Sequence, residues 1–565
     1  MAGAGAPLSA RLALCAAALL AGCTTTPPRP MATAAPQTLI SGTRVLAHIR
    51  VLSSDEFEGR LPGTIGEDKS VAYITAQFKA LGLAPGNPDG SYVQTVPLVG
   101  IEGTPLMSLT VAGRELPMQA GTDFVATSAH FEPQVSISDS PLVFVGYGVQ
   151  APEYDWDDYK GFDAHGKTLV MLINDPPVPD AADPSRLDER VFKGRAMTYY
   201  GRWTYKCEIA SKLGADGVLI IHETEPAGYG WSVVEHSWGG EAFELEDPDG
   251  NAGRVAVQGW ITLEKARALF AKSGQDFDAL KLAARTRAFR PVPLNAQVSV
   301  TIQNTLRKVS SQNVVARLPG ADPTLSQEYV VYSAHWDHLG RDPSLRGDQI
   351  FNGAADNASG VAGLIEIAHT FANTAPKAPR SILFLAVTAE EQGLLGSKYY
   401  TQHPLYPLGK TLADINMDVL NLWGRTRDVQ VVGFGQSTLD DTLSRVVSGQ
   451  QRVVVPDDEP EKGHYFRSDQ FSFAKVGVPA LAAIGGTDVR GRPAGWGKAH
   501  RQDYLEHDYH SPSDEVKPDW DMAGAAEDLT MLYEVGRDVA TAPQWPQWRA
   551  DSEFKTMRAA SPTVP

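Results

Sequence analysis

Hydrophobic and polar positions follow different patterns in successive parts of the chain, and the first pattern is helical. Between Ser41 and Pro97, apolar residues recur at helical spacing in two blocks, Val45–Leu52 and Val71–Leu81. Gly82 follows the second block and suits the end of a helix. The pattern therefore predicts two helices joined by a loop rich in Gly and Pro.

The next part of the chain, about 100–304, contains short runs rich in β-branched residues. Examples are PLVFVGYGV, KTLVMLIND and GVLIIHE, which turn-forming stretches separate. One segment, Thr204–Leu213, has helical spacing instead. This part is predicted to be a separate β-rich domain with a helix.

From Asn313 onward, apolar strands alternate with helices. The runs NVVARLPG, YVVYSAH, SILFLAV, ADINMDV, VQVVGF and VPALAAI are strand-like, whereas GVAGLIEIAHTF and AAEDLTMLYEVGRDVA are helix-like. Such alternation predicts the α/β class, here a mixed, mostly parallel sheet flanked by helices. After Pro543 the pattern ends, and we expect a loosely ordered tail.

The N-terminus, MAGAGAPLSARLALCAAALLAGC, has the features of an export signal. Arg11 precedes an apolar run, Leu12–Leu20, which is too short to be a permanent membrane span. The last four residues, LAGC, resemble a bacterial lipobox, in which Cys23 becomes the lipidated first residue; the alternative is a plain secretory signal with an incidental cysteine. Thr24 favours the outer membrane by resemblance to bacterial sorting rules. The prediction is therefore an exported, periplasmic, lipid-anchored protein.

The composition is that of a globular protein with more than one domain. The chain has 565 residues, of which 43% are hydrophobic and 21% charged. Its formal net charge is −17, and loss of Arg11 with the signal would make it about −18. This charge, without a basic cluster interleaved with aromatics, argues against nucleic acid as a partner.

The cysteine count restricts the chemistry of any metal site. The chain has three cysteines, and Cys15 and Cys23 belong to the signal region, so that Cys207 is left alone. An internal disulfide and a cysteine-based zinc site are both excluded. Any bound metal must be held by His, Asp and Glu.

Residues with metal-binding side chains follow the predicted strands and loops of the α/β part. They are His335, Asp356, Glu390, Glu391, Asp418 and His510. In open α/β sheets, ligands bind at the carboxyl ends of the strands. Histidine and carboxylate without thiolate form a ligand set that zinc accepts.

Each of these residues also has an ordinary structural interpretation. Asp356 could be a helix N-cap, His335 a loop histidine, Glu391 a solvated charge and Asp418 a turn residue. His510, before Ser-Pro, could stabilise a turn. Their common placement at one edge of the predicted sheet favours a site.

Five segments resemble, in order, the successive motifs of a known family. They are SAHWDHLG, NGAADNASG, TAEEQGLLGS, NMDVL and DYHSPSD. These motifs are similar to those of the co-catalytic di-zinc aminopeptidases of family M28, which also contains glutamate carboxypeptidases and transferrin-receptor-like proteins. The resemblance covers about Asn313–Ala540 and the N-terminal helices. It implies a zinc exopeptidase-like fold and peptide substrates.

The resemblance also implies the roles of the metal ligands. His335 and Asp418 would bind one zinc, Glu391 and His510 the other, and the Asp356 carboxylate would bridge both. The bond between Asp356 and Asn357 would be cis.

Three further residues receive roles by the same resemblance. Asp337 would orient His335, as carboxylates do for zinc-bound histidines. Glu390 would take a proton from the attacking water and pass it to the leaving amine. Tyr509 would donate a hydrogen bond to the developing oxyanion, and the alternative is a packing tyrosine.

The middle of the chain, GKTLVMLIND through KCEIASKLGADGVLIIHE, resembles a protease-associated domain inserted between the N-terminal helices and the zinc domain. Such an insert would act as a lid or a wall of the substrate site. The predicted divisions are signal 1–22, disordered tether 23–40, N-terminal helical part 41–100, insert 101–304, catalytic domain 305–545 and tail 546–565.

Two neighbours of the motif residues receive no catalytic role. His338 forms an HxxH pair with His335, but a loop gives no reason for ligation at that spacing, so it is assigned a supporting or structural role. In GHYFRSDQF, Gln470 stands where the family often has a histidine, so a substrate contact there is in doubt.

The leading hypothesis is an exported zinc aminopeptidase with two zinc ions. A carboxypeptidase or dipeptidase of the same family is the runner-up, and a receptor-like protein without catalysis is a further alternative. Glutaminyl cyclases share the fold but use one zinc, whereas residues for two are present in this chain. Side-chain preference and oligomeric state are not readable from the sequence.

Overall fold

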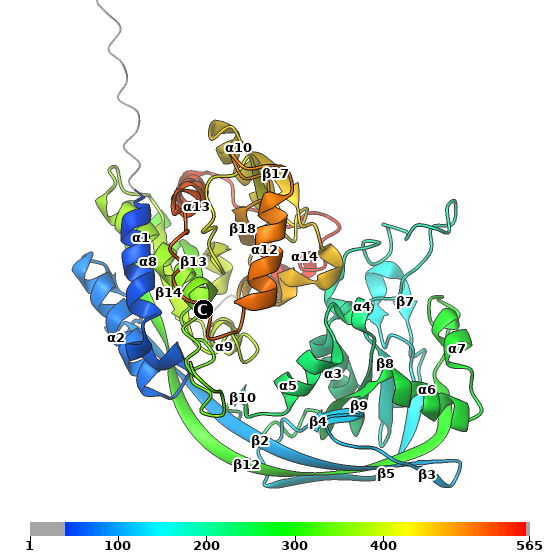
Figure 1. Cartoon of the computed structure of the whole chain (residues 1–565). Coiled ribbons are helices and arrows are strands. Elements are labelled where there is room, and N and C mark those ends of the chain that lie inside the picture. The colour runs from blue at the N-terminus through cyan, green and yellow to red at the C-terminus, as the bar shows by residue number, and fades with distance from the viewer. Residues whose placement is uncertain (1–39, 561–565) are drawn as a thin grey trace, which may run out of the picture. The chain divides into compact units, whose positions relative to one another are not determined.

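The structure, a computed structural model, describes residues 40–560 (Figure 1). The predicted signal, Cys23 and the tether up to residue 39 lie outside the described residues, as do residues 561–565. Among the described residues, no helix combines the length and apolar character that a bilayer span requires.

Helices and strands alternate along most of the chain. The helices are α1 (Gly42–Leu52), α2 (Ile65–Ala80), α3 (Trp203–Lys212), α4 (Thr224–Ala227), α5 (Trp231–Trp238), α6 (Leu263–Lys272), α7 (Phe277–Ala283), α8 (Gly360–Asn373), α9 (Leu395–Gln402), α10 (Leu439–Gly449), α11 (Gln470–Lys475), α12 (Trp496–His507), α13 (Ala523–Thr541) and α14 (Lys555–Ala560). The strands are β1 (Ala84–Pro85), β2 (Val93–Val111), β3 (Arg114–Leu116), β4 (Phe124–Thr127), β5 (Gln134–Phe144), β6 (Gln150–Ala151), β7 (Trp156–Asp157), β8 (Thr168–Leu172), β9 (Gly217–His222), β10 (Ala242–Leu245), β11 (Val257–Thr262), β12 (Val292–Leu318), β13 (Tyr329–His335), β14 (Ser381–Val387), β15 (Thr411–Asn416), β16 (Asp428–Val432), β17 (Val453–Pro456) and β18 (Ala480–Gly485).

The two predicted N-terminal helices are present, and polar caps set their starts. α1 begins after Ser41, whose hydroxyl accepts a hydrogen bond from the Arg44 amide. α2 begins after Thr64, whose hydroxyl accepts from the Gly66 amide. A side chain that caps free amides stabilises a helix start, so α2 begins before the predicted apolar block.

The α/β part of the chain contains the predicted mixed sheet. The strand order is β17-β16-β18-β15-β13-β14-β12. β13 pairs in parallel with both β14 and β15. β15 also pairs in parallel with β18, and β16 pairs in parallel with β17. Two pairs are antiparallel, namely β16 with β18 and β12 with β14. The predicted fold class is therefore confirmed.

Both faces of this sheet are covered, as β13 illustrates. Val330 and Tyr332 pack into a core shared with α1, α2, α8 and α13. The alternate residues, Tyr329 and Val331, pack into a second core that includes Tyr400 of α9. A parallel strand buried on both faces has a continuous apolar sequence, which explains the runs without polar alternation.

The insert is joined to the α/β part by two long strands (Figure 1). β2 and β12 pair antiparallel from Val93 with Val314 to Val111 with Ala296. The core of the insert is formed by residues between Leu109 and Ile302. β2 and β12 run continuously past positions 101 and 304, the predicted limits of the insert, so these limits stay predictions. The likeness of the insert to a protease-associated domain also stays a prediction. The predicted helix in the insert is present as α3.

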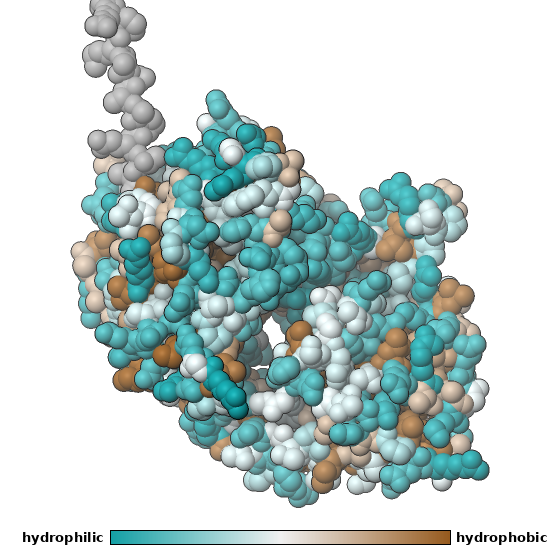
Figure 2. Space-filling model, viewed as in Figure 1, coloured by the Kyte–Doolittle hydropathy of each residue, from teal (hydrophilic) through white to brown (hydrophobic). Residues whose placement is uncertain are grey.

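Hydrophilic residues cover most of the face seen in Figure 2, and hydrophobic residues form small separate groups on it. Large exposed apolar residues include Leu106, Val233 and Leu282, which belong to different elements. Single exposed apolar residues are normal on protein surfaces.

The tail prediction was wrong for the described residues after Pro543. Trp548 and Phe554 are buried in a cluster with Phe466 and Phe471. The Trp548 indole donates a hydrogen bond to the Gly477 carbonyl oxygen at 2.8 Å. Two isolated aromatics show no periodicity, and their partners lie far away in sequence, so the pattern alone could not place them.

Arg60 ties the N-terminal helices to the loops at the carboxyl edge of the sheet. The side chain is buried, and its guanidinium donates hydrogen bonds to four carbonyl oxygens. They belong to Leu52 (2.8 Å), Trp336 (2.8 Å), Asn352 (2.6 Å) and Gly353 (2.9 Å). Hydrogen bonds from a charged donor are stronger than neutral ones, so this residue fixes three separate segments.

We predict that Arg60→Met lowers the free energy of unfolding by at least about 3 kcal/mol, because it leaves buried carbonyl groups without donors. Arg50→Met, at an exposed position of α1, is the matched control and should change it by less than about 0.5 kcal/mol. Urea titration followed by tryptophan fluorescence measures both. Equal midpoints for the two variants would contradict the role assigned to Arg60.

Candidate functional site

Three neighbouring parallel strands carry candidate ligands to one edge of the sheet. β13 ends at His335, Glu390 follows the end of β14 by three residues, and Asp418 follows the end of β15 by two. Because β13 lies between β14 and β15, their carboxyl ends meet there. Sequence reasoning therefore placed these three residues correctly.

Asp356 comes from the turn that precedes α8, and several hydrogen bonds fix its backbone. The bond from Asp356 to Asn357 is cis, as predicted. The Asn357 side-chain oxygen accepts from the amides of Gly360 at 2.9 Å and Val419 at 3.2 Å. The Asp514 carboxylate accepts from the Asp356 amide at 3.0 Å. The turn is thus held from three sides.

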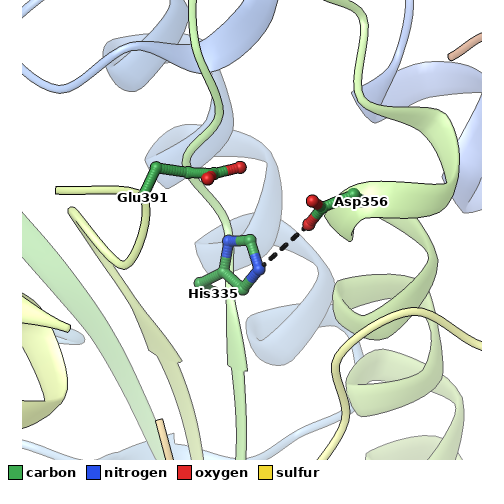
Figure 3. Close-up of side chains that lie close together, drawn as sticks. All are labelled: His335, Asp356 and Glu391. Atoms are coloured by element: carbon green, nitrogen blue, oxygen red, sulfur yellow. Dashed lines mark ion pairs between the residues drawn. The ribbon is translucent and has the colours of Figure 1, made fainter. Parts of the chain in front are cut away.

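The histidines and carboxylates form two groups that share Asp356. His335 Nε2 lies 3.2 Å from Asp356 Oδ1 and 3.3 Å from Asp418 Oδ1. His510 Nε2 lies 3.3 Å from Asp356 Oδ2 and 3.1 Å from Glu391 Oε2. Each oxygen of Asp356 therefore faces a different histidine. In Figure 3 the carboxylates of Asp356 and Glu391 point toward one another beside the His335 ring.

These separations fit a shared cation in each group. Two ligand atoms placed about 2.1 Å from one tetrahedral zinc ion lie about 3.4 Å apart. The four nitrogen–oxygen distances, 3.1–3.3 Å, agree with that value. Imidazole nitrogens and carboxylate oxygens are also the donor atoms that zinc accepts. The residues present therefore fit a pair of zinc sites bridged by Asp356.

Glu390 also belongs to this cluster. His335, Glu390 and Asp418 can present one ligand atom each within a few ångströms of one another. Burial raises the pKa of Glu390 well above its ordinary value, Asp418 adds to the rise, and His335 opposes it. Its neighbour Glu391 behaves differently: burial favours its neutral form, but His510 and a hydrogen bond from His338 lower its pKa to about 2.

Asp337 positions the backbone of the two glutamates. Its carboxylate accepts hydrogen bonds from the amides of Glu390 at 3.1 Å and Glu391 at 3.3 Å. His335 Nδ1 lies 3.2 Å from the main-chain oxygen of Asp337 and 3.8 Å from its carboxylate. The main-chain oxygen of Asp337 therefore accepts the hydrogen bond that orients His335, whereas the carboxylate had been predicted to do so. Burial raises the pKa of Asp337 to about 7.

His338 contacts a predicted ligand. Its Nδ1 lies 2.7 Å from Glu391 Oε1, while the other oxygen of Glu391 faces His510. This contact agrees with the supporting role assigned to His338. A partner on the second carboxylate oxygen fixes the orientation of a ligand.

Tyr509 lies beside the cluster. Its ring is stacked on His510 with ring centres 3.9 Å apart, and the side chain is 42% exposed. It is therefore not a core packing residue, which was the alternative interpretation of this tyrosine.

Sequence reasoning missed Asp514, which supports the site, and Asp469, which is buried near it. Asp514 follows His510 by four residues and holds the Asp356 turn through the amides of Ala355 and Asp356. Asp469 is buried, and burial raises its pKa to about 7. Asp514 lay inside the motif DYHSPSD, and Asp469 inside GHYFRSDQF, so the motifs located them without indicating their contacts.

Comparison with known proteins gives a family match for the α/β part. Residues 313–533 match the sequence model of Peptidase family M28. The matched segment contains every predicted ligand, namely His335, Asp356, Glu391, Asp418 and His510, as well as Glu390.

Relatives of the chain carry related names. Aminopeptidase YwaD of Bacillus subtilis (strain 168) is 25% identical over 469 residues, which cover 82% of this chain and 78% of that one. Aminopeptidase NAALADL1 of Mus musculus is 34% identical over 133 residues, or 22% of this chain and 16% of that protein. A "Probable zinc metalloprotease" of Pyrenophora teres f. teres is 37% identical over 113 residues, which cover 20% of this chain and 23% of that protein. The chain thus matches less than a quarter of the last two relatives.

Among solved structures, the aminopeptidase from Aneurinibacillus sp. strain AM-1 is similar with a TM-score of 0.48 and 20% identity, covering 90% of this chain and 95% of that one. The zinc aminopeptidase BSAP from Bacillus subtilis has a TM-score of 0.42 and 18% identity, covering 91% and 97%.

We predict that Asp356→Asn weakens zinc binding by at least about 100-fold, since loss of a residue that only supports a ligand already costs about 10- to 100-fold. Calorimetric titration of metal-free protein with zinc chloride measures this. Asp348→Asn, an exposed aspartate before the same turn, is the control and should leave the titration unchanged. Unaltered binding in Asp356→Asn would exclude Asp356 as a ligand.

Proposed function

We propose that the protein is an exported zinc aminopeptidase that removes N-terminal residues from peptides with two zinc ions. One observation carries the proposal: the two oxygens of Asp356 each face a different histidine, and each histidine faces one further carboxylate. His335 and Asp418 would hold one ion, and Glu391 and His510 the other. The match to Peptidase family M28 and the relatives named aminopeptidase and zinc metalloprotease support it.

When bound by these residues, two zinc ions would supply Lewis-acid chemistry, polarising the scissile carbonyl group and activating a water molecule. Glu390 accepts a proton from the attacking water and delivers it to the leaving amine, a role supported by its position beside His335 and Asp418. Asp337 keeps Glu390 and Glu391 in place through their amides. The Tyr509 hydroxyl donates a hydrogen bond to the negative oxygen that develops on the carbonyl group.

The adjacent glutamates leave the same strand but have separate tasks. Glu391 lies between His338 and His510 and binds metal. Glu390 lies on the side of His335 and Asp418 and transfers the proton. A substitution at one position should therefore affect metal content and turnover differently from a substitution at the other.

For the substrate class, the zinc-loaded protein should release free amino acids from unblocked peptides and from peptides amidated at the C-terminus. It should leave N-acetylated peptides intact, lose activity with a chelator and regain it with zinc. Cleavage of N-acetylated peptides, with C-amidated peptides left intact, would indicate the carboxypeptidase alternative.

Within this assay, Glu390→Gln should retain zinc and lower kcat by about 100- to 10,000-fold, the usual contribution of a general base. Glu391→Ala should lose zinc. Full turnover in Glu390→Gln would refute the assigned proton transfer.

We further propose that the chain is anchored by lipid at Cys23 on the outer membrane, facing the periplasm. In a bacterial host that processes lipoproteins, labelled palmitate should be incorporated into the full chain and be absent from Cys23→Ser. Cys207→Ser is the control, because Cys207 lies buried in the insert and should leave the label unchanged. Absence of label from the parent protein would favour the plain secretory signal instead.

A further inference from the structure

The insert contacts the catalytic part next to the cluster of predicted metal ligands. Tyr199 of the insert packs on Phe471, with ring centres 4.9 Å apart. Glu208 of α3 forms an ion pair with Lys475 of α11 at 2.6 Å. These contacts bring the insert against the stretch 460–475, which contains the buried Asp469. The same stretch borders the candidate site, because the side-chain amide of Asn416, two residues before Asp418, donates to Ser468 Oγ at 2.7 Å and to Gln470 Oε1 at 2.8 Å.

Two arginines at this contact have buried donors without an acceptor among the described residues. Arg202 precedes α3 in the insert, and Arg467 follows the turn His464–Phe466 in the catalytic part. Nε of Arg202, and Nε and Nη2 of Arg467, are buried without a hydrogen-bond acceptor within residues 40–560. No ion pair with either guanidinium occurs in that part of the chain. By contrast, Arg195 at the same contact is exposed and pairs with Glu461 at 2.8 Å.

Their surroundings supply aromatic rings and further cations. The guanidinium carbon of Arg467 lies 5.6 Å from the centre of the Tyr229 ring. Burial lowers the pKa of Arg202 to about 10, and the charge of Arg467 contributes. His464 adds no negative charge, and burial and Arg467 lower its pKa to about 4. Glu459, an acid of the same stretch, is already bound to Lys462 at 2.8 Å.

A buried guanidinium without an acceptor costs free energy, since its N–H groups lose water and gain nothing in return. A cation–π contact offsets part of that cost but accepts no hydrogen bond in the guanidinium plane. Buried N–H groups of this kind occur on both sides of this contact, at Arg202 of the insert and at Arg467 of the catalytic part, and they offer donors to an anion. A planar carboxylate matches the fork of guanidinium donors.

Arg467 lies at this border of the candidate site, one residue before Ser468. Tyr509, which stacks on His510, is near enough to Arg467 to raise the pKa of that guanidinium against the lowering by burial. One residue of extended peptide spans about 3.5 Å. A peptide with its scissile bond at the metal ligands can therefore extend past Tyr509 toward Arg467.

We propose that Arg202 and Arg467 bind a carboxylate of the peptide substrate, one arginine contributed by the insert and one by the catalytic part. This inference rests on the proposed function and narrows it to peptides that carry a carboxylate near the scissile bond. Two sources share this chemistry: the terminal carboxylate of a dipeptide, and an Asp or Glu side chain in a longer peptide.

The test compares kcat/KM for matched substrates of the zinc-loaded full chain. Leu-Leu against Leu-Leu-amide probes the terminal carboxylate. Leu-Glu-amide against Leu-Gln-amide, and Glu-Leu-amide against Gln-Leu-amide, probe side chains on either side of the bond. In at least one pair, the parent protein should have a higher kcat/KM for the peptide that carries the carboxylate. For that peptide, kcat/KM should fall by about tenfold or more in Arg202→Gln and in Arg467→Ala, mainly through a rise in KM. The neutral partner should change little.

Arg195→Ala is the matched control at the same contact, and it should retain the preference. Arg467→Lys should recover only part of it, because lysine keeps the charge and loses the planar fork. Equal hydrolysis of acidic and neutral substrates, or equal slowing of both in the variants, would overturn the carboxylate site while leaving the aminopeptidase proposal intact. Failure of the zinc-loaded parent to hydrolyse any of these peptides would overturn the proposed function, and the inference with it.

Discussion

Burial of several carboxylates at one edge of a sheet is the constraint on which the site depends. Like charges that leave water together are costly unless positive charge compensates them. In this cluster Asp356 and Glu391 lie against histidines at 3.1–3.3 Å, and the fully buried Arg60 adds a fixed cation nearby. Burial, together with neighbouring acids, raises the pKa of Glu390, although His335 opposes the rise. Bound cations are the natural compensation.

The architecture meets this constraint by fixing the backbone before the side chains. Parallel strands bring three residues of the candidate site to one edge, but Asp356 comes from a turn that no strand positions. Asp514 and Asn357 hold that turn through amide hydrogen bonds, and Asp337 does the same for the two glutamates. Acidic residues thus serve in two ways: some face the histidines, and others accept amide hydrogen bonds that keep the first group in place.

Much of this arrangement could be predicted from the sequence, because it depends on local order. Apolar runs followed by His or acidic residues indicate strand ends, and parallel strands share an edge, so His335, Glu390 and Asp418 were correctly grouped. Contacts between distant segments left no such pattern. The burial of Trp548, like the hydrogen bond of His335 to the backbone of Asp337, depends on packing that only the folded chain shows.

The unpaired arginines illustrate the same limit and add an argument about the insert. Arg202 and Arg467 lie 265 positions apart, so no local pattern could join them. In most proteins, buried guanidinium groups are paired, since the cost of desolvation is otherwise not recovered. A chain can retain two guanidinium groups without a protein acceptor where a ligand supplies the acceptor. Folding has then already removed their N–H groups from water before the ligand binds. In that case the insert contributes directly to substrate binding. A bound carboxylate would contact one arginine from the insert and one from the catalytic part, and would thereby join the two parts. Substrate choice would then depend on their contact, at Tyr199 and Phe471, as well as on the metal ligands.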